Sequence, residues 1–349
     1  MNETMLAAVY HGPDDLRVEA VPLPAISAEE ILVKVVNSSI CGTDLRILHG
    51  GHRKYPSGTV RIPGHEVVGD IAAVGAQVRG LSVGQRVFVA PNMGCGNCRQ
   101  CVSGNNNLCA NYDAIGITID GAFAEYLRIP SAAILQGNVM PLDPGIDPAA
   151  AALVEPFACV LRGQNAVGVQ VGDIVVVVGA GPIGVMHMQL ARLRGASCVI
   201  ASEMIPERRA QTQHFGADLA AAPEELHEVV NKVSRGEGAD VVIVAAPAHK
   251  AQESAVQIAA IGGRINFFGG LPKDRPTINV DSNVIHYKEL IVTGTTACST
   301  NDCRQAAAIV NSGRIDLSPL VSARYPLRDA VQAFAMAEDR KSLKVVLQP

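Results

Sequence analysis

The spacing of hydrophobic positions divides the chain into two parts with different sequence patterns. Over about the first 150 residues, short apolar runs are interrupted by glycine and proline, and turn signals recur at intervals typical of all-β domains. The clearest strand-like runs are 31–36, 66–75, 84–91 and 123–130. This part of the chain is therefore predicted to be a β-rich domain of the barrel or sandwich type.

From residue 174 onward, strand-like runs alternate with helix-like segments. The strand-like runs, each built around consecutive apolar residues, lie at 174–179, 198–203, 240–246, 264–270 and 289–294. The helix-like segments between them span 182–196, 206–216 and 249–262. Strands that are apolar on both sides and are separated by helices predict a parallel sheet covered on both faces. Two amphipathic helices, 301–313 and 327–339, and a last strand at 344–349 complete the chain.

Composition and charge limit the possible partners. The chain has 349 residues, which is long enough for two domains, and its 29 basic and 33 acidic residues are evenly mixed, for a net charge of −4. This balance argues against a nucleic-acid partner, which needs a basic face. The apolar runs are far shorter than a membrane span, and the first residues lack a secretion signal. We therefore expect a cytoplasmic protein, in which clustered cysteines bind metal rather than form disulfides.

A glycine motif follows the first strand of the alternating region. Gly179, Gly181 and Gly184 form G-x-G-x-x-G directly after an apolar run and at the start of a helix. The first glycine permits a tight turn, the second lets a pyrophosphate approach the backbone, and the third lets helix and strand pack closely. Pro182 suits the first helical turn, where its missing N–H costs nothing, and both Pro182 and Ile183 are candidate cofactor-binding residues. The motif in this context predicts a dinucleotide site.

An acidic residue, Glu203, ends the next strand-like run. A carboxylate at this place accepts hydrogen bonds from the ribose hydroxyls of NAD and repels the 2′-phosphate of NADP. NAD is therefore the expected cofactor. Arg208 and Arg209 follow closely, so binding of NADP stays open.

Four cysteines lie within a short loop, at 95, 98, 101 and 109. The first three fit an iron–sulfur run, but such a run needs its fourth cysteine sooner and a proline after it, whereas Ala110 follows here. A nucleic-acid zinc ribbon would separate its two pairs further and carry basic surroundings. The remaining fit is a closed tetrahedral zinc site of Cys95, Cys98, Cys101 and Cys109, which holds the loop and cannot bind substrate.

A second group of possible ligands is scattered over the first half of the chain. Cys41 and Thr43 lie in CGTD, His65 and Glu66 in GHE, and Glu155 in VEP. A catalytic zinc binds three or four N, S and O ligands and keeps one exchangeable position. Taken singly, each residue also fits an ordinary structural role, and spacing alone does not bring them together.

The five motifs in this order resemble the zinc-dependent medium-chain dehydrogenases, and most closely the sorbitol (polyol) dehydrogenase branch. The resemblance runs over the full chain. It implies an α/β protein with a GroES-like catalytic domain formed by residues 1–153 and 298–349, which carries a structural zinc lobe at 94–110. It also implies a Rossmann NAD-binding domain at 154–297. A homo-oligomer, tetramer or dimer, is expected on the resemblance alone.

The resemblance also implies roles for single residues. Cys41, His65 and Glu155 resemble the catalytic zinc ligands, Glu66 matches a glutamate that binds the zinc directly or through water, and the four loop cysteines match the structural zinc. Two zinc ions per chain are therefore expected. Thr43 matches the hydroxyl that accepts the proton of the substrate. The segments around Phe268, Gly269 and Thr295 resemble the wall beside the nicotinamide.

These assignments imply oxidation of a secondary alcohol in a small polyol or sugar-like molecule to a ketone, with hydride transfer to NAD. A threonine-type or simple secondary-alcohol dehydrogenase is the alternative within the same class. A zinc-free reductase would have no use for Cys41, His65 and the cysteine loop together. A non-catalytic NAD sensor would be signalled by loss of a ligand or of Thr43, and none is lost.

One position departs from the family pattern. Many relatives have a histidine five residues after the zinc-binding cysteine, where it relays a proton to solvent, and this chain has Arg46. An arginine stays protonated and cannot act as a base. The proton is therefore predicted to pass from Thr43 to a ribose hydroxyl of the cofactor and then to water, while Arg46 contacts the cofactor or a polar substrate group. His49 is the alternative relay. Cys159, Cys198, Cys298 and Cys303 are interpreted as packing residues.

Overall fold

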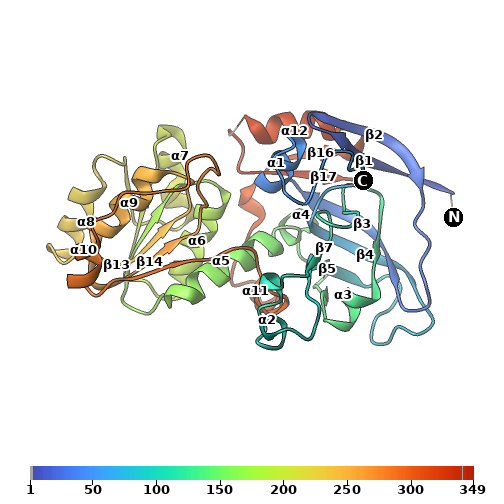
Figure 1. Ribbon diagram of the computed structural model, residues 1–349, viewed down its shortest axis with the longest axis horizontal. Coiled ribbons are helices and arrows are strands. Elements are labelled where there is room, and N and C mark those ends of the chain that lie inside the picture. Colours follow the sequence, from blue (N-terminus) through green and yellow to red (C-terminus); the bar gives the residue numbers. More distant parts are fainter. Residues whose placement is uncertain (1–2, 340) are drawn as a thin grey trace. The chain divides into compact units, whose positions relative to one another are not determined.

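The computed structural model describes residues 3–339 and 341–349, which form two compact units (Figure 1). The first unit contains residues 1–158 and 298–349, and the second contains 159–297. The sequence placed the first boundary at 153, before helix α5 (Val154–Val167), whereas the units divide inside this helix. The first turn of α5 therefore belongs to the first unit.

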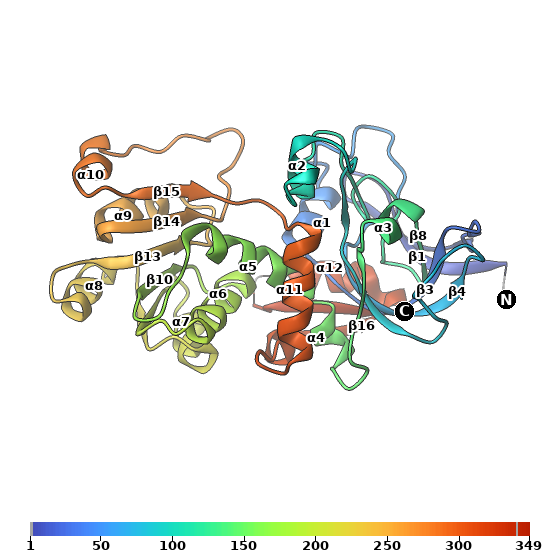
Figure 2. The ribbon, with the colours of Figure 1, turned by 90° about the horizontal axis from the view of Figure 1, so that it is seen from below.

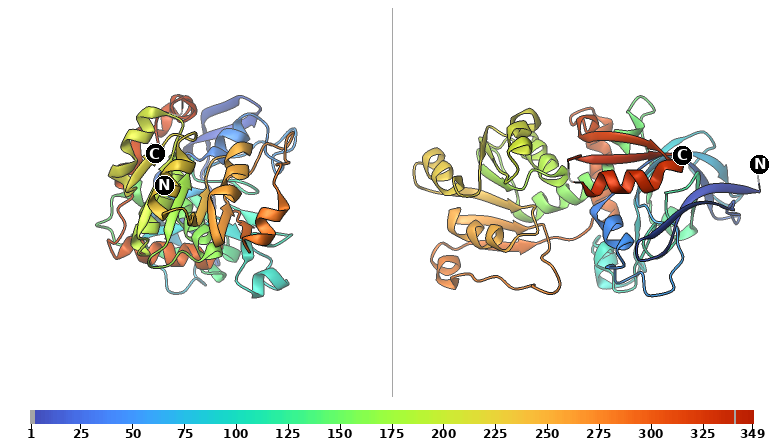
Figure 3. Two further views of the ribbon diagram at one scale, coloured as in Figure 1. Left: turned by 90° about the vertical axis from the view of Figure 1, so that its left-hand side faces the viewer. Right: turned by 90° about the horizontal axis from the view of Figure 1, so that it is seen from above.

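The first unit is built on a seven-stranded sheet. The strands follow the order β16 (Val321–Pro326), β17 (Lys344–Gln348), β3 (Ile31–Ser39), β4 (Glu66–Val74), β5 (Arg86–Val89) and β9 (Val139–Pro141), and β8 (Tyr126–Ile129) pairs with β3. Strand β17 runs antiparallel to β3, so the last strand of the chain lies beside an early one. This pairing is seen as red strands next to blue ones in Figure 3.

Smaller elements surround this sheet. They are the hairpin β1 (Thr4–Gly12) and β2 (Asp15–Pro22), the pair β6 (Asn92–Met93) and β7 (Asp113–Ala114), and helices α1 (Gly42–Leu48), α2 (Arg99–Val102), α3 (Ser131–Leu135), α4 (Pro148–Ala151), α11 (Thr300–Asn311) and α12 (Ala330–Glu338). Short 3-10 turns lie at Asn106–Leu108, Ser318–Leu320 and Leu327–Asp329. Helix α12 packs against β17, and Phe334 on this helix contacts Phe123 edge-to-face in one of the apolar cores of the unit.

The second unit is a six-stranded sheet in which every pairing is parallel. The order is β12 (Leu219–Ala221), β11 (Cys198–Ser202), β10 (Ile174–Val178), β13 (Ala239–Val244), β14 (Ala259–Phe267) and β15 (Ile291–Gly294). The helices are α6 (Pro182–Leu193), α7 (Pro206–Gln211), α8 (Leu226–Ser234), α9 (His249–Ile258) and α10 (Ser282–Tyr287), with a 3-10 turn at Thr212–Phe215. This order reverses direction at β10, as in doubly wound dinucleotide-binding sheets.

The unbroken apolar strands of this sheet bury both of their faces. Val176 and Val178 pack in one cluster with residues of α8 and α9, while Val175 and Val177 pack in another with residues of α6. Because successive side chains of a strand point to opposite faces, a strand covered on both sides needs an apolar residue at every position. The helices on the two sides can be followed in Figure 2.

Two details of the sequence-based assignment were wrong or incomplete. The helix predicted at 249–262 ends at Ile258, and strand β14 begins at Ala259. Strand β12 and helix α8 were not singled out in the sequence. No helix among the residues that the structure describes is long and apolar enough to cross a membrane.

Candidate active site and metal centres

Three of the predicted catalytic ligands meet in the first unit. The ligand atoms of Cys41, His65 and Glu66 all lie within 4.8 Å of one another. Cys41 immediately precedes α1, and Glu66 begins β4. The register of the sheet pairs Ser39 at the end of β3 with Glu66, which brings the start of α1 next to the start of β4. The pairing of β3 with β4 therefore assembles the three ligands.

Asp44 orients two of these ligands. Its side chain is fully buried, and one carboxylate oxygen, Oδ1, lies 3.3 Å from His65 Nδ1. The other oxygen accepts the backbone N–H of Cys41 at 2.9 Å. A histidine whose Nδ1 faces a carboxylate presents Nε2 to a metal. Burial by itself lowers the pKa of His65, but Asp44 and Cys41 outweigh it and hold that pKa well above its usual value, so the site favours a positive charge.

Glu66 is held through one of its oxygens. Lys344 Nζ and Ser39 Oγ both donate to Glu66 Oε2, and Lys344 also donates to Ser39 Oγ at 3.2 Å and to the Ile40 carbonyl at 3.3 Å. Burial by itself lowers the pKa of Lys344, but the Glu66 carboxylate reverses this, and the pKa is raised. Glu66 Oε1 is buried and has no hydrogen-bond partner among the described residues.

This arrangement fits a zinc ion. A thiolate sulfur, an imidazole nitrogen and a carboxylate oxygen form a donor set that zinc prefers. The buried Glu66 Oε1 without a partner would otherwise carry a desolvation cost, which a cation removes. Cys41, His65 and Glu66 are therefore suited to hold the ion, and Asp44 and Lys344 fix their positions.

Glu155 lies outside this group of three. It is buried in the first turn of α5, and its Oε1 accepts a hydrogen bond from the thiol of Cys298 over 3.5 Å. Among the described residues, the Glu155 carboxylate lies close to cysteine sulfurs. It does not belong to the group formed by Cys41, His65 and Glu66. Glu155 stays a predicted zinc ligand.

Thr43 is the second residue of α1 and is partly exposed. Within the described part of the chain its hydroxyl makes no hydrogen bond, so it is available to a substrate. Arg46 is exposed on the same helix and forms no ion pair within residues 3–339 and 341–349. The role of Arg46 in binding cofactor or substrate stays a prediction.

His49 occupies a structural position at the end of α1. Its Nδ1 contacts Asp14 at 2.6 Å and its Nε2 contacts Glu338 on α12. Hydrogen bonds to Glu338 and Asp14 raise the pKa of His49. A protonated histidine at a helix C-terminus also interacts favourably with the helix dipole. Because both ring nitrogens contact carboxylates, the structure favours a tethering role over a proton relay.

We expect the contribution of His49 to stability to fall with rising pH. Since its folded pKa is raised above the usual 6.5, the contribution is complete below that value and is lost as the pH rises through the folded pKa. The melting-temperature difference between wild type and His49→Gln should therefore be larger at about pH 6 than at about pH 9. Scanning calorimetry would measure it, with His214→Gln, an exposed histidine of the second unit, as the control. A turnover loss in His49→Gln at constant melting temperature would instead indicate a relay.

The four loop cysteines form a second centre in the same unit. Their ligand atoms lie within 4.8 Å of one another, and the Sγ–Sγ distances include 3.5 Å for Cys98–Cys101, 3.8 Å for Cys98–Cys109 and 4.0 Å for Cys95–Cys101. Tetrahedral zinc with Zn–S bonds of about 2.3 Å needs sulfur separations of about 3.8 Å. The loop approaches itself so closely that a Cβ at Gly94 would lie 2.4 Å from Cys101 Sγ. The loop is therefore shaped for one ion with four sulfur ligands.

Cys98→Ser is expected to release one zinc ion and to lower the melting temperature, because three thiolates cannot close the tetrahedron. Elemental analysis and calorimetry on the same sample would measure both effects. Cys198→Ser, at the start of β11 in the second unit, is the matched control and should change neither. Iron and acid-labile sulfide in the purified protein would contradict the assignment of zinc.

The predicted dinucleotide residues gather at one edge of the parallel sheet. Gly179 follows β10 and has a φ of 101°, which favours glycine. A Cβ at Gly184 would lie 1.8 Å from the Gly179 carbonyl oxygen, so helix α6 can pack this closely on β10 only with glycine there. Gly181 immediately precedes Pro182, the first residue of α6. The N-terminus of a 12-residue helix thus meets an open glycine loop, which suits a pyrophosphate.

Glu203 lies at the same edge, after β11, and is buried. Its two oxygens accept the backbone N–H groups of Ala180 at 2.7 Å and Ile205 at 2.9 Å. Arg209 donates to the Glu203 carbonyl at 2.8 Å. A guanidinium nitrogen of Arg208 lies 3.9 Å from where a Cβ of Gly181 would be, so Arg208 reaches over the glycine loop. Glu203 and both arginines thus lie at the end of β11, next to the glycine loop.

The residues that are predicted to lie beside the nicotinamide come directly after the last two strands of this sheet. Phe268 and Gly269 come after β14, and their N–H groups donate to the Val244 carbonyl at 3.1 Å and 2.9 Å. Thr295 follows β15, and its hydroxyl accepts from Asn266 Nδ2 at 3.3 Å. Because the carboxyl ends of parallel strands share one edge, these residues lie on the same edge as the glycine loop.

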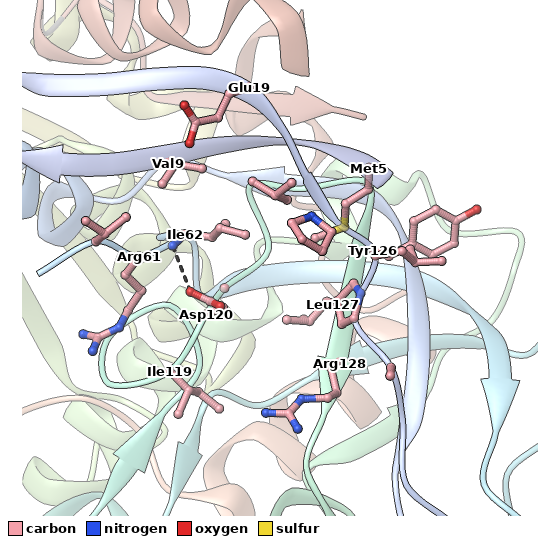
Figure 4. A pocket seen from close by; sticks show the side chains of 17 residues that line it. Met5, Val9, Glu19, Arg61, Ile62, Ile119, Asp120, Tyr126, Leu127 and Arg128 are labelled. Carbon is pink, nitrogen blue, oxygen red and sulfur yellow. Dashed lines mark hydrogen bonds between the residues drawn. The ribbon is translucent and has the colours of Figure 1, made fainter. Parts of the chain in front are cut away.

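A separate cavity of about 580 Å³ lies in the first unit, under the β1–β2 hairpin (Figure 4). Its wall combines apolar residues such as Met5 and Leu127 with the charged residues Glu19, Arg61 and Arg128. At the side of the cavity, Asp120 Oδ1 accepts a hydrogen bond from the backbone N–H of Ile62 at 3.0 Å. None of the predicted zinc, proton-accepting or cofactor residues lines it, so it is not the candidate active site.

Sequence reasoning missed Asp44, Ser39, Lys344 and Cys298. Asp44 is the last residue of the CGTD motif, and an acid one turn after a metal-binding cysteine was a usable signal. Lys344 is a charged residue at the start of an otherwise apolar last strand, which indicates a buried partner. Ser39 and Cys298 carried no such signal, because only the pairing of distant segments gives them a role.

Comparisons with known proteins agree with this geometry. Residues 27–141 match the alcohol dehydrogenase GroES-like domain, and residues 182–312 match the zinc-binding dehydrogenase domain. L-threonine 3-dehydrogenase of Bacillus subtilis is 32% identical over 339 residues, which are 94% of each chain.

Solved structures show the same likeness. A putative zinc-binding dehydrogenase of Sinorhizobium meliloti, solved with NADP, is 32% identical, covers 100% of each chain and has a TM-score of 0.92. Galactitol-1-phosphate dehydrogenase of Escherichia coli is 28% identical, covers 99% of this chain and 100% of its own, and has a TM-score of 0.88. With its GroES-like and Rossmann-type parts, the chain belongs to the zinc-binding alcohol dehydrogenase family of medium-chain dehydrogenases.

Proposed function

We propose that the protein oxidises a secondary alcohol next to a second hydroxyl group, as in polyols and sugar-like molecules, to the ketone with NAD as the hydride acceptor. The observation that carries this proposal is the group of Cys41, His65 and Glu66, in which His65 and Glu66 are buried and Cys41 lies two residues before the available hydroxyl of Thr43. A dehydrogenase that uses zinc needs both a ligand set and a proton acceptor for the alcohol.

The residues of the site then have separate tasks. A zinc ion held by Cys41, His65, Glu66 and Glu155 would polarise the substrate oxygen, while the nicotinamide would accept the hydride. Asp44 keeps His65 in the orientation that binds metal. Thr43 accepts the proton of the substrate hydroxyl and passes it toward solvent, because Arg46 cannot act as a base.

The preference for NAD rests on Glu203. Its carboxylate is fixed by two backbone N–H groups at the end of β11, where a ribose 2′-phosphate would meet negative charge. The related protein from Sinorhizobium meliloti was solved with NADP, so the cofactor of this chain is a point to test.

Glu203→Arg should shift the ratio of kcat/KM for NAD over NADP toward NADP by about 10–100-fold, since a hydrogen bond to a charged group is worth about 1.5–3 kcal/mol. Steady-state kinetics with both cofactors would measure the ratio. Glu207→Arg, an exposed acid in the first turn of α7, is the matched control and should leave the ratio unchanged. Preference of the unmodified enzyme for NADP would show that Arg208 or Arg209 outweighs the carboxylate.

A second candidate substrate is L-threonine. It is supported by the B. subtilis L-threonine 3-dehydrogenase, which is 32% identical to this chain over almost its full length. Threonine also has a secondary alcohol beside a polar group, although that group is an amine. The polyol class is supported by the likeness to galactitol-1-phosphate dehydrogenase.

A substrate panel distinguishes the candidates. The zinc-loaded protein is assayed for NAD reduction with vicinal diols and polyols, with L-threonine, and with ethanol and 2-propanol. Polyols and vicinal diols should give the highest kcat/KM. Activity confined to L-threonine would establish the second candidate. Equal activity on ethanol, or no NAD or NADP reduction by a protein that contains zinc, would contradict the proposal.

A further inference from the structure

Two buried thiols lie face to face beside Glu155. Cys298 and Cys303 are 0% and 1% exposed, and their Sγ atoms are 3.4 Å apart. Cys298 precedes helix α11, and Cys303 lies in its first turn, where its N–H donates to the Ser299 carbonyl at 3.0 Å. Neither residue belongs to the four-cysteine centre. The interpretation of these cysteines as packing residues does not account for this contact.

The backbone on both sides of the pair is fixed. Ser299 and Asp302 cap α11 reciprocally: the Ser299 N–H donates to Asp302 Oδ2 at 2.9 Å, and the Asp302 N–H donates to Ser299 Oγ at 3.1 Å. Asn92 Nδ2 donates to the Cys298 carbonyl at 3.0 Å. The cap and this amide set the positions of Cys298 and Cys303. Their approach thus follows from the local fold and does not depend on a mobile loop.

We propose that Cys298 and Cys303 are a redox modification site, which closes reversibly to a disulfide in response to a small hydroperoxide. The two sulfurs must move from 3.4 Å to about 2.05 Å to form the bond. One cysteine loses its proton, and the resulting thiolate attacks the O–O bond of hydrogen peroxide. Its sulfur becomes a sulfenic acid, and the released hydroxide takes up the proton to form water. The second thiol then displaces the sulfenic hydroxyl as a second water and forms the S–S bond.

Oxidation would change the surroundings of Glu155. In the reduced protein the Cys298 thiol donates to Glu155 Oε1 over 3.5 Å, and a disulfide sulfur has no hydrogen to donate. The effect on turnover rests on the proposed function, in which Glu155 is a ligand of the catalytic zinc. Loss of a hydrogen bond to a metal ligand lowers activity or metal affinity by about 10–100-fold, so a decrease of this size is expected on oxidation.

The sequence allows a direct test. Trypsin cleaves after Lys288 and Arg304, and the peptide 289–304 contains Cys298 and Cys303 and no other cysteine. The zinc-loaded protein is treated with hydrogen peroxide, alkylated and digested. The peptide should lose two hydrogen atoms and take up no alkyl group, and dithiothreitol should reverse both changes. Zinc content is measured on the same sample, because oxidation of Cys41 or of the four-cysteine centre would release metal.

Single variants separate this pair from the other thiols. Cys303→Ser leaves the Cys298 thiol and should keep the activity of the reduced enzyme while losing the reversible inactivation by peroxide. Cys198→Ser, the matched control, should be inactivated like wild type. A peptide 289–304 that is alkylated at both cysteines after peroxide treatment overturns the disulfide, whatever the activity. A disulfide that leaves kcat/KM unchanged overturns its effect on Glu155, whereas a reduced enzyme inactive on the whole substrate panel overturns the proposed function alone.

Discussion

Lys344→Met is expected to destabilise the protein by about 3–5 kcal/mol, because it leaves the carboxylate of Glu66 buried without its cation. The Lys344 and Glu66 side chains are 4% and 0% exposed, so water cannot replace the lost ammonium group. Methionine keeps the length and apolar stem of lysine and therefore removes the charge without opening a large cavity. Urea-induced unfolding would measure the change in protein from which the catalytic zinc has been removed, because a zinc ion on Glu66 would supply a second positive charge.

Two further variants of the chain make this prediction specific. Lys341→Met, three residues earlier and with a side chain that is 81% exposed, should change the stability by less than about 1 kcal/mol. Combining Lys344→Met with Glu66→Gln should restore most of the loss, since the uncompensated charge is then removed as well. If Lys344→Met were as stable as Lys341→Met, the buried pair would not hold Glu66 in the way described here.

Thr43→Val should lower kcat by about 10²–10⁴, which is the usual contribution of a positioned proton acceptor. Valine has nearly the shape of threonine, and the Thr43 hydroxyl makes no hydrogen bond within the described residues, so the fold has little reason to change. Steady-state kinetics over a range of pH, with zinc content and melting temperature on the same sample, would measure the effect.

Thr4→Val is the matched control for this variant. Thr4 is exposed at the start of strand β1, and its replacement should leave kcat unchanged. A Thr43→Val enzyme with full turnover and intact zinc would rule out Thr43 as the proton acceptor. A fall in kcat together with loss of zinc would indicate that Thr43 supports the metal site instead.

Local sequence rules account for the second unit well. In β10 every position from Val175 to Val178 is buried, and a run that is apolar at each residue is what a parallel strand covered on both faces requires. Gly179 is needed for its positive φ, and Gly184 is needed for the close contact between helix and strand. The spacing of the glycine motif predicts both requirements. The helix boundary at Ile258 was missed because Ala259 and Ala260 fit a helix as well as a strand.

The candidate site was only partly predictable. The four cysteines of the structural centre lie in one loop, so their short spacing sufficed to predict a common metal. Cys41, His65 and Glu66 could be assembled only through the resemblance to a family, because Cys41 lies on a different segment from His65 and Glu66. The resemblance also includes Glu155, which contacts Cys298 in the structure and stays a predicted ligand.

The sequence by itself determined the alternating architecture of the second unit and the four-cysteine centre. It also determined the glycine loop and the acidic residue, Glu203, at the end of the next strand. Each depends on residues that are neighbours along the chain or on a periodicity that repeats within one element. Only the tertiary structure decided that Lys344 neutralises Glu66, that Asp44 orients His65, and that Cys298 meets Cys303 beside Glu155. These contacts depend on the pairing of β17 with β3 and of β3 with β4 and on how distant segments pack, which local sequence does not specify.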